Sequence, residues 1–321
     1  STTITLNPTT YVYDGKAKTP TVTVKDGSTT LTKDTHYTVS YSNNTNVGTA
    51  TATITGKGNY NGTATKTFTI TKANSSISLS PKTATYTGSA IAANKATVTG
   101  TTGAVTYTYY TNSSCSTQTT TSTGASGTGK APVDVGNYYV KATAAASSNY
   151  NSVTSSCVAH TINKKSIAVT WGSTITFTYN GSAQAPSITT PVTGAGSEKL
   201  NLTRTTGTNV GSYTSTASCS SVSGGRAKCT NYTLTGNTKA FTINKANSSI
   251  SLTAKTATYT GSAIAANTAS VTGTTGAVTY TYYTNSSCST QTTTSTGASA
   301  TGGAPVDAGT YYVKATAAAS S

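Results

Sequence analysis

The sequence predicts an all-β protein that consists of several antiparallel β-sandwiches. Segments such as 51–55 and 105–109 alternate with a period of two residues and use β-branched and aromatic side chains. This alternation is typical of strands that are buried on one face only. No segment of useful length shows the 3.6-residue period of a helix. Turn signals recur every 8–12 residues, which indicates short strands in sandwiches.

The composition is unusually polar for a folded chain. Hydrophobic residues make up 34% of the 321 residues, against about 45–50% in typical globular domains. Chains of low hydrophobicity are often disordered, because they cannot offset the entropy lost on folding. Here the regular alternation favours strands instead, with Thr on the solvated face and Val, Ile and Tyr on the buried face.

Internal repeats define the domain organisation. Residues 74–148 match residues 247–321 at an offset of 173, with eight differences. Residues 1–73 and 165–246 follow the same plan with more changes. We therefore predict four domains, at 1–73, 74–164, 165–246 and 247–321, and the fourth is a near-copy of the second that is incomplete at its C-terminal end.

Four short motifs mark the repeats. A Tyr-x-Gly motif lies near the start of each copy, an Asp/Asn-x-Gly corner lies in its second half, an Asn-Tyr pair follows the corner, and a last strand ends in Lys. The motifs start at Tyr13, Tyr86, Tyr179 and Tyr259, at Asn46, Asp134, Asn209 and Asp307, and at Asn59, Asn149 and Asn231, and the last strands end at Lys72, Lys164 and Lys245.

Three of the corners place a Tyr two residues after the Gly. They are Asp134, Gly136 and Tyr138; Asn209, Gly211 and Tyr213; and Asp307, Gly309 and Tyr311. This spacing resembles the tyrosine corner of immunoglobulin folds, in which the Tyr hydroxyl bonds to upstream backbone. The first copy departs from it, with Ala50 in the place of the Tyr.

With the Tyr-x-Gly motif and the closing Ile-Thr/Asn-Lys, these corners resemble the bacterial immunoglobulin-like (Big-like) repeats of large surface proteins, including the MBG and YDG types. The resemblance covers essentially the whole chain. It implies a tandem array of immunoglobulin-like antiparallel β-sandwiches on the bacterial cell surface. The junctions at 72–74, 164–166 and 245–247 contain no flexible spacer, so we expect the array to be an extended rod.

Five cysteines are present, and the repeat explains the odd number. Cys288 is the copy of Cys115, and the copy of Cys157 would fall nine residues beyond Ser321. We therefore predict the disulfides Cys115–Cys157 and Cys219–Cys229, with Cys288 lacking its partner. Zinc ligation is the rival interpretation, but no Cys-x-x-Cys pair or His cluster supports it. Disulfides indicate an oxidising, extracellular setting.

The charge favours anionic partners. The net charge is +15, from 21 Lys and Arg against 6 acids. We expect contact with an anionic glycan or cell-wall polymer. Scattered Lys residues also protect strand edges from pairing with other chains. No basic run with interleaved aromatics occurs, so no nucleic-acid binding is predicted. No apolar run in this segment predicts a membrane span.

We expect no enzyme, no cofactor and no metal site. His36 and His160 each stand alone in a strand pattern. Glycosidase chemistry needs two neighbouring carboxylates, whereas the second, third and fourth copies hold one acid each, which are Asp134, Glu198 and Asp307.

The predicted function is therefore structural, as a rod, stalk or fibre segment of a bacterial cell-surface repeat protein or filament. The alternative is an adhesin whose repeats bind glycan or a host or partner-cell protein through loop tips such as 220–228. The incomplete fourth copy implies either that the protein continues past Ser321 or that a neighbouring copy donates the missing strand. The second and fourth copies alternate with the divergent third, so the chain looks like slightly under two periods of a longer two-domain repeat.

Overall fold

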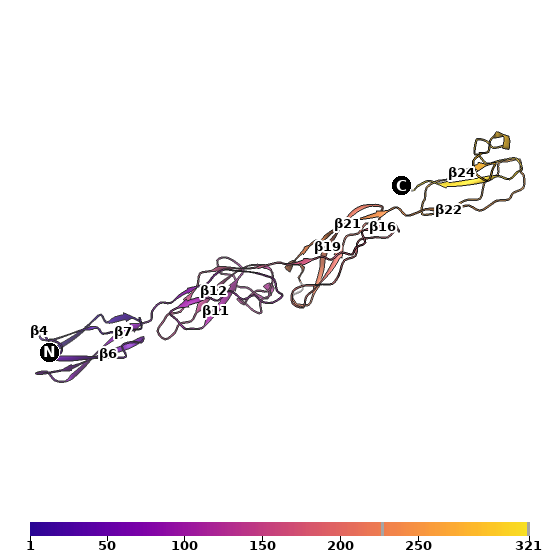
Figure 1. Cartoon of the computed structure of the whole chain (residues 1–321). Coiled ribbons are helices and arrows are strands. Elements are labelled where there is room, and N and C mark those ends of the chain that lie inside the picture. Colours follow the sequence, from indigo (N-terminus) through magenta and orange to yellow (C-terminus); the bar gives the residue numbers. More distant parts are fainter. Residues whose placement is uncertain (226–227, 320–321) are drawn as a thin grey trace. The chain divides into compact units, whose positions relative to one another are not determined.

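A computed structural model describes residues 1–225 and 228–319 (Figure 1). The chain divides into two compact units. The first unit comprises Ser1–Thr170, Ile188–Thr203 and Ala217–Asn237. The second unit comprises Trp171–Ser187, Arg204–Thr216 and Thr238–Ser321. These units do not coincide with the four sequence repeats, because residues 165–246 contribute to both. The four repeat boundaries therefore stay predictions.

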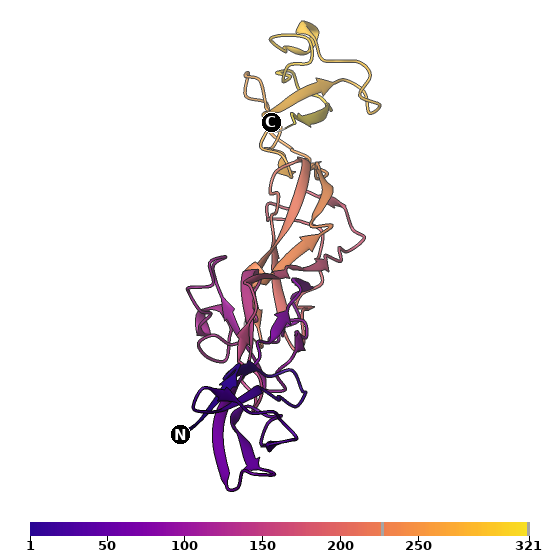
Figure 2. The ribbon, with the colours of Figure 1, turned by 90° about the vertical axis from the view of Figure 1, so that its left-hand side faces the viewer.

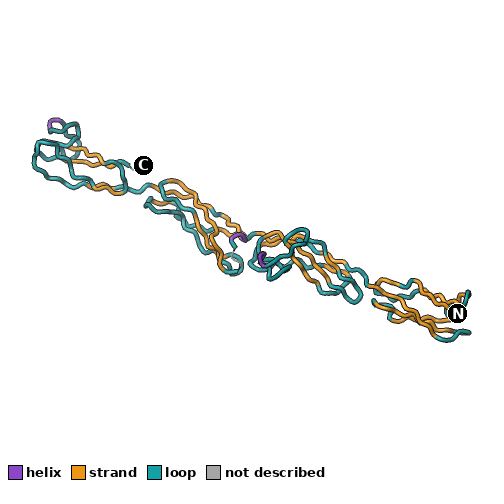
Figure 3. Tube along the Cα trace, turned by 180° about the vertical axis from the view of Figure 1, so that it is seen from behind, coloured by secondary structure: helices purple, strands orange, loops and turns teal. Residues whose placement is uncertain are grey.

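The described chain is all-β, as the alternation of the sequence predicts (Figure 3). Its helical structure consists of three short 3-10 turns in the described residues. None of the helices in this part of the chain has the length and apolar character needed to span a membrane. The 3-10 turns are η1 (Thr121–Thr123), η2 (Cys229–Asn231) and η3 (Thr294–Thr296).

Residues 1–73 form two sheets with a hydrophobic core between them. One sheet has the order β1-β3-β4 and the other the order β2-β7-β6-β5. The strand β6 reads Gly-Thr-Ala-Thr-Ala-Thr-Ile-Thr-Gly, and its alternate residues Ala50, Ala52 and Ile54 are buried. Ala52 and Ile54 pack with Val24 of β3, which joins the two sheets. The strands are β1 (Thr2–Asn7), β2 (Thr10–Val12), β3 (Thr21–Asp26), β4 (Thr29–Thr30), β5 (Tyr37–Ser42), β6 (Gly48–Gly56) and β7 (Thr63–Thr71).

Residues 74–164 again form two sheets. A two-stranded sheet pairs β8 with β10, and a five-stranded sheet has the order β11-β12-β14-β9, with β13 against β12. The central strand β12 buries Tyr138, Val140, Ala142 and Ala144 at every second position. The strands are β8 (Ser76–Ser78), β9 (Lys82–Thr85), β10 (Thr97–Thr99), β11 (Val105–Tyr110), β12 (Gly136–Ala144), β13 (Val153–Thr154) and β14 (Val158–Asn163).

Residues 165–246 are shared between the two units. In the first unit, β15 pairs with β20, and β17 pairs with β18. In the second unit, β21 pairs with β16 and with the first half of β19. The strands are β15 (Lys165–Ala168), β16 (Thr176–Thr178), β17 (Val192–Thr193), β18 (Lys199–Arg204), β19 (Gly211–Ser223), β20 (Tyr232–Thr235) and β21 (Thr238–Asn244).

The described residues of the fourth repeat form only two strand pairs, which lie among long loops in yellow in Figure 2. β22 pairs with β23, and β24 pairs with β25. The segment 255–258, which corresponds to β9 of the second repeat, is not a strand. The strands are β22 (Ser249–Ser251), β23 (Ser270–Thr272), β24 (Val278–Tyr283) and β25 (Tyr312–Ala317).

The expectation of purely antiparallel sheets is wrong at specific edges. β2 is parallel to β7, β9 to β14, β15 to β20 and β16 to β21. In each case a strand near the start of a repeat lies beside one near its end. Parallel neighbours need a long connection between them, and here the intervening strands of the repeat provide it.

The disulfides Cys115–Cys157 and Cys219–Cys229 are present, with Cys288 a free thiol that is partly exposed. These are the pairs that the sequence predicts. The bridges join residues 42 and 10 positions apart, for which the loss of chain entropy in the unfolded state corresponds to about 4 and about 3 kcal/mol. The predicted loop between Cys219 and Cys229 is shorter than expected, because β19 continues to Ser223. Residues 226 and 227 of that loop lie outside the described residues.

His160 belongs to the core of the second repeat. Its side chain is fully buried on β14, and its ring lies edge-on to Tyr109 with the centroids 5.3 Å apart. Burial lowers the pKa of His160 below its usual value, since the charged imidazolium would lose its hydration. The folded protein therefore holds this His in its neutral form.

We predict that this repeat loses stability in mild acid. Folding lowers the pKa of His160. Above the unfolded pKa of about 6.5, the folded and unfolded chains both hold this His neutral, and its protonation does not reduce stability. Below that pH the unfolded chain binds one proton more, and stability falls by up to about 1.4 kcal/mol per pH unit. Urea unfolding at pH 7.5 and pH 5.5 should show this loss, and His160→Phe should reduce it. His36→Gln is the control and should retain it; an equal loss in H160F would contradict the assignment.

Candidate functional site

The three predicted tyrosine corners are closed by hydrogen bonds. The hydroxyl of Tyr138 donates to the carbonyl of Asp134 at 3.0 Å. The hydroxyls of Tyr213 and Tyr311 donate to the carbonyls of Asn209 and Asp307 at 2.8 and 3.1 Å. In each corner the carbonyl of the first residue thus accepts a hydrogen bond from the Tyr of its own repeat. The other polar groups of the corner take no part in this bond.

The glycines of two corners make room for the tyrosine ring. A Cβ at Gly136 would lie 3.0 Å from the Tyr138 ring, and a Cβ at Gly309 would lie 3.2 Å from the Tyr311 ring. Gly211 has a φ of 155° instead, which a side chain rarely adopts. In the first repeat Ala50 takes the place of the Tyr and is fully buried in β6, so that corner lacks this bond, as its sequence indicates.

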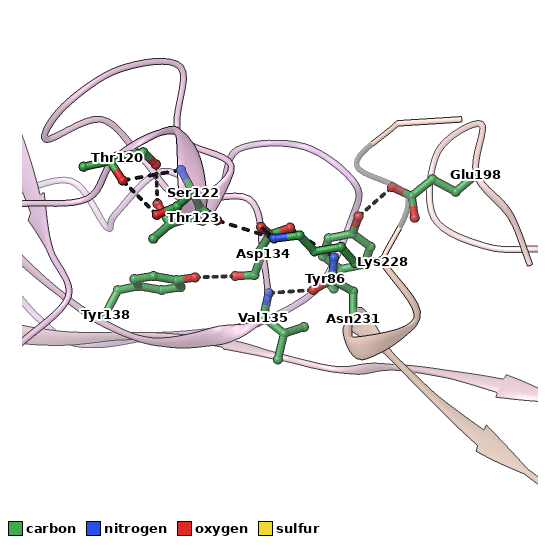
Figure 4. A network of polar contacts seen from close by, with 10 residues as sticks. All are labelled: Tyr86, Thr120, Ser122, Thr123, Asp134, Val135, Tyr138, Glu198, Lys228 and Asn231. Atoms are coloured by element: carbon green, nitrogen blue, oxygen red, sulfur yellow. Dashed lines mark hydrogen bonds and ion pairs between the residues drawn. The ribbon is translucent and has the colours of Figure 1, made fainter. Parts of the chain in front are cut away.

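The corner of the second repeat receives an Asn from the third repeat. The side-chain oxygen of Asn231 accepts from the backbone N–H of Val135 at 3.0 Å (Figure 4). Its side-chain nitrogen donates to Asp134 Oδ1 at 3.1 Å. Asn231 and Asp134 are 1% and 6% exposed, so water contributes little to satisfying these groups.

The corner of the first repeat receives an Asn from the second repeat in the same way. The side-chain oxygen of Asn149 accepts from the N–H of Val47 at 3.0 Å, and its nitrogen donates to Asn46 Oδ1 at 3.1 Å. The backbone of Asn149 also pairs with Ala73, whose N–H donates to the Asn149 carbonyl at 3.0 Å. The Asn of the Asn-Tyr motif thus plays one role at both places.

The Tyr of the same motif meets the Tyr-x-Gly motif of the preceding repeat. The rings of Tyr13 and Tyr150 lie edge-to-face with centroids 5.4 Å apart, and those of Tyr86 and Tyr232 lie edge-to-face at 5.5 Å. Such aromatic pairs contribute about 0.5–1.5 kcal/mol beyond the area that they bury.

Three motifs that are distant in the sequence therefore converge, and we call each convergence an Asn-Tyr joint. The first joint comprises Tyr13, Asn46, Val47, Asn149 and Tyr150, and the second comprises Tyr86, Asp134, Val135, Asn231 and Tyr232. All of these residues belong to the first compact unit.

A buried carboxylate strengthens the second joint. Glu198 is 1% exposed, and its side chain accepts hydrogen bonds from the hydroxyls of Tyr86, at 2.6 Å, and Tyr232. Burial, followed by the hydrogen bond to Glu198, raises the pKa of Tyr232 to about 12. Burial raises the pKa of Tyr86 further still. Both hydroxyls therefore remain protonated and can donate to the carboxylate.

An ion pair borders the same joint. Lys228 Nζ lies 2.6 Å from Asp134 Oδ2, and the aspartate side chain is 8% exposed whereas the lysine side chain is 43% exposed (Figure 4). Hydrogen bonds between ionised groups are about twice as strong as those between neutral groups. Lys228 also donates to the carbonyl of Ser122 at 3.4 Å. Lys228 thus binds within the protein, although it belongs to the loop that the adhesin interpretation assigns to a ligand.

The motifs could be located from the sequence, but the contacts between them could not. The Asn-Tyr pairs served only as repeat markers, and Glu198 only as a solitary acid in its repeat. The signal available in the sequence is that Asn149 and Asn231 recur at matching positions. A short polar side chain that recurs beside a Tyr indicates a role in packing or in binding.

The joint can hold two chain segments in a fixed register, because its donors and acceptors bind one another. The expectations that the chain is no enzyme and needs no cofactor stay predictions. The sequence matches no protein-family model and no curated protein.

We predict that Tyr232→Phe weakens the second joint. The change removes one donor from a buried carboxylate, which costs about 1.5–3 kcal/mol for a hydrogen bond to a charged group. It also removes the acceptor of the Ala195 N–H, which donates to the Tyr232 hydroxyl at 2.8 Å. Hydrogen exchange of the amides in 188–203 should therefore speed up.

Tyr150→Phe is the matched control. In the described residues the Tyr150 hydroxyl makes no hydrogen bond of this kind, and its ring keeps the contact with Tyr13. Exchange near the first joint should change little. Equal effects of the two substitutions would show that the carboxylate does not matter.

Proposed function

We propose that the chain is an extracellular structural protein, a rod, stalk or fibre segment built from tandem immunoglobulin-like β-sandwiches of a bacterial cell-surface repeat protein or filament, without catalytic activity. In this proposal the Asn-Tyr joint fixes the second repeat on the first and the third repeat on the second.

The observation that carries the proposal is the recurrence of one joint at two successive boundaries. Asn149 contacts Asn46 and Val47 as Asn231 contacts Asp134 and Val135. A binding or catalytic site has no reason to recur at each boundary, whereas a device that sets the geometry between neighbours must do so.

The polar groups at the joint favour a stiff connection. A buried N–H that loses its partner costs about 1–3 kcal/mol, and bending at the joint would separate the Val135 N–H from Asn231. The short junctions leave little free chain to absorb such a movement: Ala73 at the first junction already pairs with Asn149 and Asn151.

The two disulfides support an extracellular location, because disulfides persist in oxidising compartments. The net charge of +15 fits a surface in contact with anionic glycan or cell-wall polymer. Neighbouring copies of the same repeat are the partners that the joint itself fits.

We predict that removing the two Asn side chains loosens the array. Spin labels at the exposed positions Thr29 and Thr233, in a Cys288→Ser background, report the distance between the first and third repeats by double electron–electron resonance. The labelled chain with both Asn side chains intact should give one narrow distance distribution. Asn149→Ala with Asn231→Ala should make it at least about twofold wider, since the linkers then behave as flexible tethers.

Asn59→Ala is the matched control. Asn59 is the exposed Asn of the same motif in the first repeat, and its replacement should leave the distribution narrow. A distribution that is broad in the unaltered chain would refute a stiff array. Saturable capture of one glycan on a glycan array, unaffected by the two Asn substitutions, would favour the adhesin interpretation instead.

A further inference from the structure

The second joint brings an amine, a side-chain amide and a carboxylate together. Lys228 Nζ donates to Asp134 Oδ2 at 2.6 Å, and Asn231 Nδ2 donates to Asp134 Oδ1 at 3.1 Å (Figure 4). The amine of Lys228 and the amide of Asn231 are therefore held on the two oxygens of one carboxylate. Lys228 and Asn231 belong to the third repeat, whereas Asp134 belongs to the second.

The local backbone places the amine beside the amide. Lys228 is the N-cap of η2, and the N–H of Asn231 donates to the Lys228 carbonyl at 3.2 Å. In a 3-10 turn the side chains at positions i and i+3 lie on the same side. The disulfide between Cys219 and Cys229 ties this turn to β19. The turn thus holds the two side chains on one side without help from the second repeat.

The amide carbonyl of Asn231 is polarised by the second repeat. The backbone N–H of Val135 donates to Asn231 Oδ1 at 3.0 Å, and Asn231 is 1% exposed. A fixed N–H donor at a carbonyl oxygen stabilises the negative charge that develops when a nucleophile adds to the carbonyl carbon. The contact that closes the joint therefore also makes Cγ of Asn231 a better electrophile.

The Asp134 carboxylate can carry a proton from the amine to the amide nitrogen. Its Oδ2 lies at the amine and its Oδ1 lies at the amide nitrogen, and its side chain is 8% exposed. A positioned carboxylate can act first as a general base and then as a general acid. Burial favours transfer of the proton within the pair, because the neutral amine and carboxylic acid need less hydration than the two ions.

The first joint shows that closing a corner requires neither the amine nor the carboxylate. Asn149 makes the same two contacts there, with the Val47 N–H and with Asn46 Oδ1. Asn46 stands in the place of Asp134, and Ala146 stands three residues before Asn149, where the third repeat has Lys228. The charged pair of the second joint therefore points to a role beyond holding the corner.

We propose that Lys228 and Asn231 become joined by an isopeptide bond, with Asp134 of the second repeat as the proton carrier. The bond forms only after the joint has assembled, because the second repeat supplies both Asp134 and the Val135 N–H. The product keeps both contacts of the joint, since Oδ1 remains for Val135 and the new amide N–H remains for Asp134. The bond also fixes the Asn231 side chain in the conformation that the joint requires, which lowers the entropy cost of keeping the joint closed.

The reaction is a transamidation that releases ammonia. Asp134 Oδ2 takes one proton from the Lys228 ammonium, and the neutral Nζ adds to Cγ of Asn231. Asp134 then gives its proton to Nδ2, the bond between Cγ and Nδ2 breaks, and Asp134 is a carboxylate again. A second proton from Nζ leaves with the ammonia, as ammonium. Held side by side, the two groups need no activation by an external reagent.

The test is the mass of the folded 321-residue chain, measured after denaturation and reduction of its disulfides. We expect a mass that is one ammonia below the mass calculated from the sequence. Trypsin should fail to cleave after Lys228, and tandem mass spectrometry should find Nζ of Lys228 bonded to Cγ of Asn231. Asn149 should retain its ammonia, because the first joint has no amine at the matching position.

Two variants separate the reaction from the assembly of the joint. Asp134→Asn copies the pair of Asn side chains that closes the first joint, so the joint should persist while the ammonia is retained. Slow hydrogen exchange of the Val135 amide in this variant would show that the joint is still assembled. Lys228→Arg keeps a positive charge beside Asp134 but lacks the amine, and it should also retain the ammonia.

Three results would overturn the proposal. The full calculated mass of the unaltered chain would show that no bond forms. A loss of ammonia that persists in Asp134→Asn would assign the loss to another reaction, such as cyclisation of Asn61 or Asn180, which each precede a Gly. A loss of one water, with Lys228 bonded to Asp134, would show that the carboxylate and not the amide is the electrophile.

Discussion

The side-chain amide of Asn231 is the contact on which the second joint depends. It satisfies the N–H of Val135 and one oxygen of Asp134 together. The carbonyl of Asp134 is already bound by Tyr138 within its own repeat. The corner therefore has an inner side that its own repeat completes and an outer side that only the next repeat completes. In the third repeat the corresponding Val210 and Tyr179 are 45% and 40% exposed, whereas Tyr86 is 1% exposed.

Completing a corner with groups from the next repeat suits a chain that has few apolar residues. A small sandwich with a thin core is marginally stable by itself, since a small domain buries a smaller fraction of its surface than a large one. The joint adds buried contacts at the ends of the repeats, and many of them are polar. Such contacts stabilise only when every group has a partner, which is why Glu198 lies between two tyrosine hydroxyls and Asp134 between Lys228 and Asn231.

Local features of the fold could be predicted from the sequence, and long-range pairings could not. The alternation in 51–55 predicts a strand with Thr on its solvated face, and the structure confirms a strand there, in which Ala52 and Ile54 are buried. The repeat offset predicts the pairing of Cys115 with Cys157, which the structure shows. The bond between Tyr86 and Glu198 spans 112 positions, and nothing local to either residue distinguishes it. The parallel edge formed by β9 and β14 was missed for the same reason, because strand direction depends on how distant segments meet.

The second and fourth repeats show that a strand is a property of a pair of segments. Lys82–Thr85 is the strand β9 because β14 runs beside it. The matching Lys255, Thr256, Ala257 and Thr258 have the same side chains but no strand structure. The hydrogen bond from Lys82 to the Ala92 carbonyl recurs from Lys255 to Ala265. It therefore does not depend on a neighbouring strand, whereas the strand character of 255–258 does. A segment of alternating Thr and Ala has too little apolar surface to hold an extended conformation by itself. The cross-strand partner therefore determines whether such a sequence forms part of a sheet or an open edge.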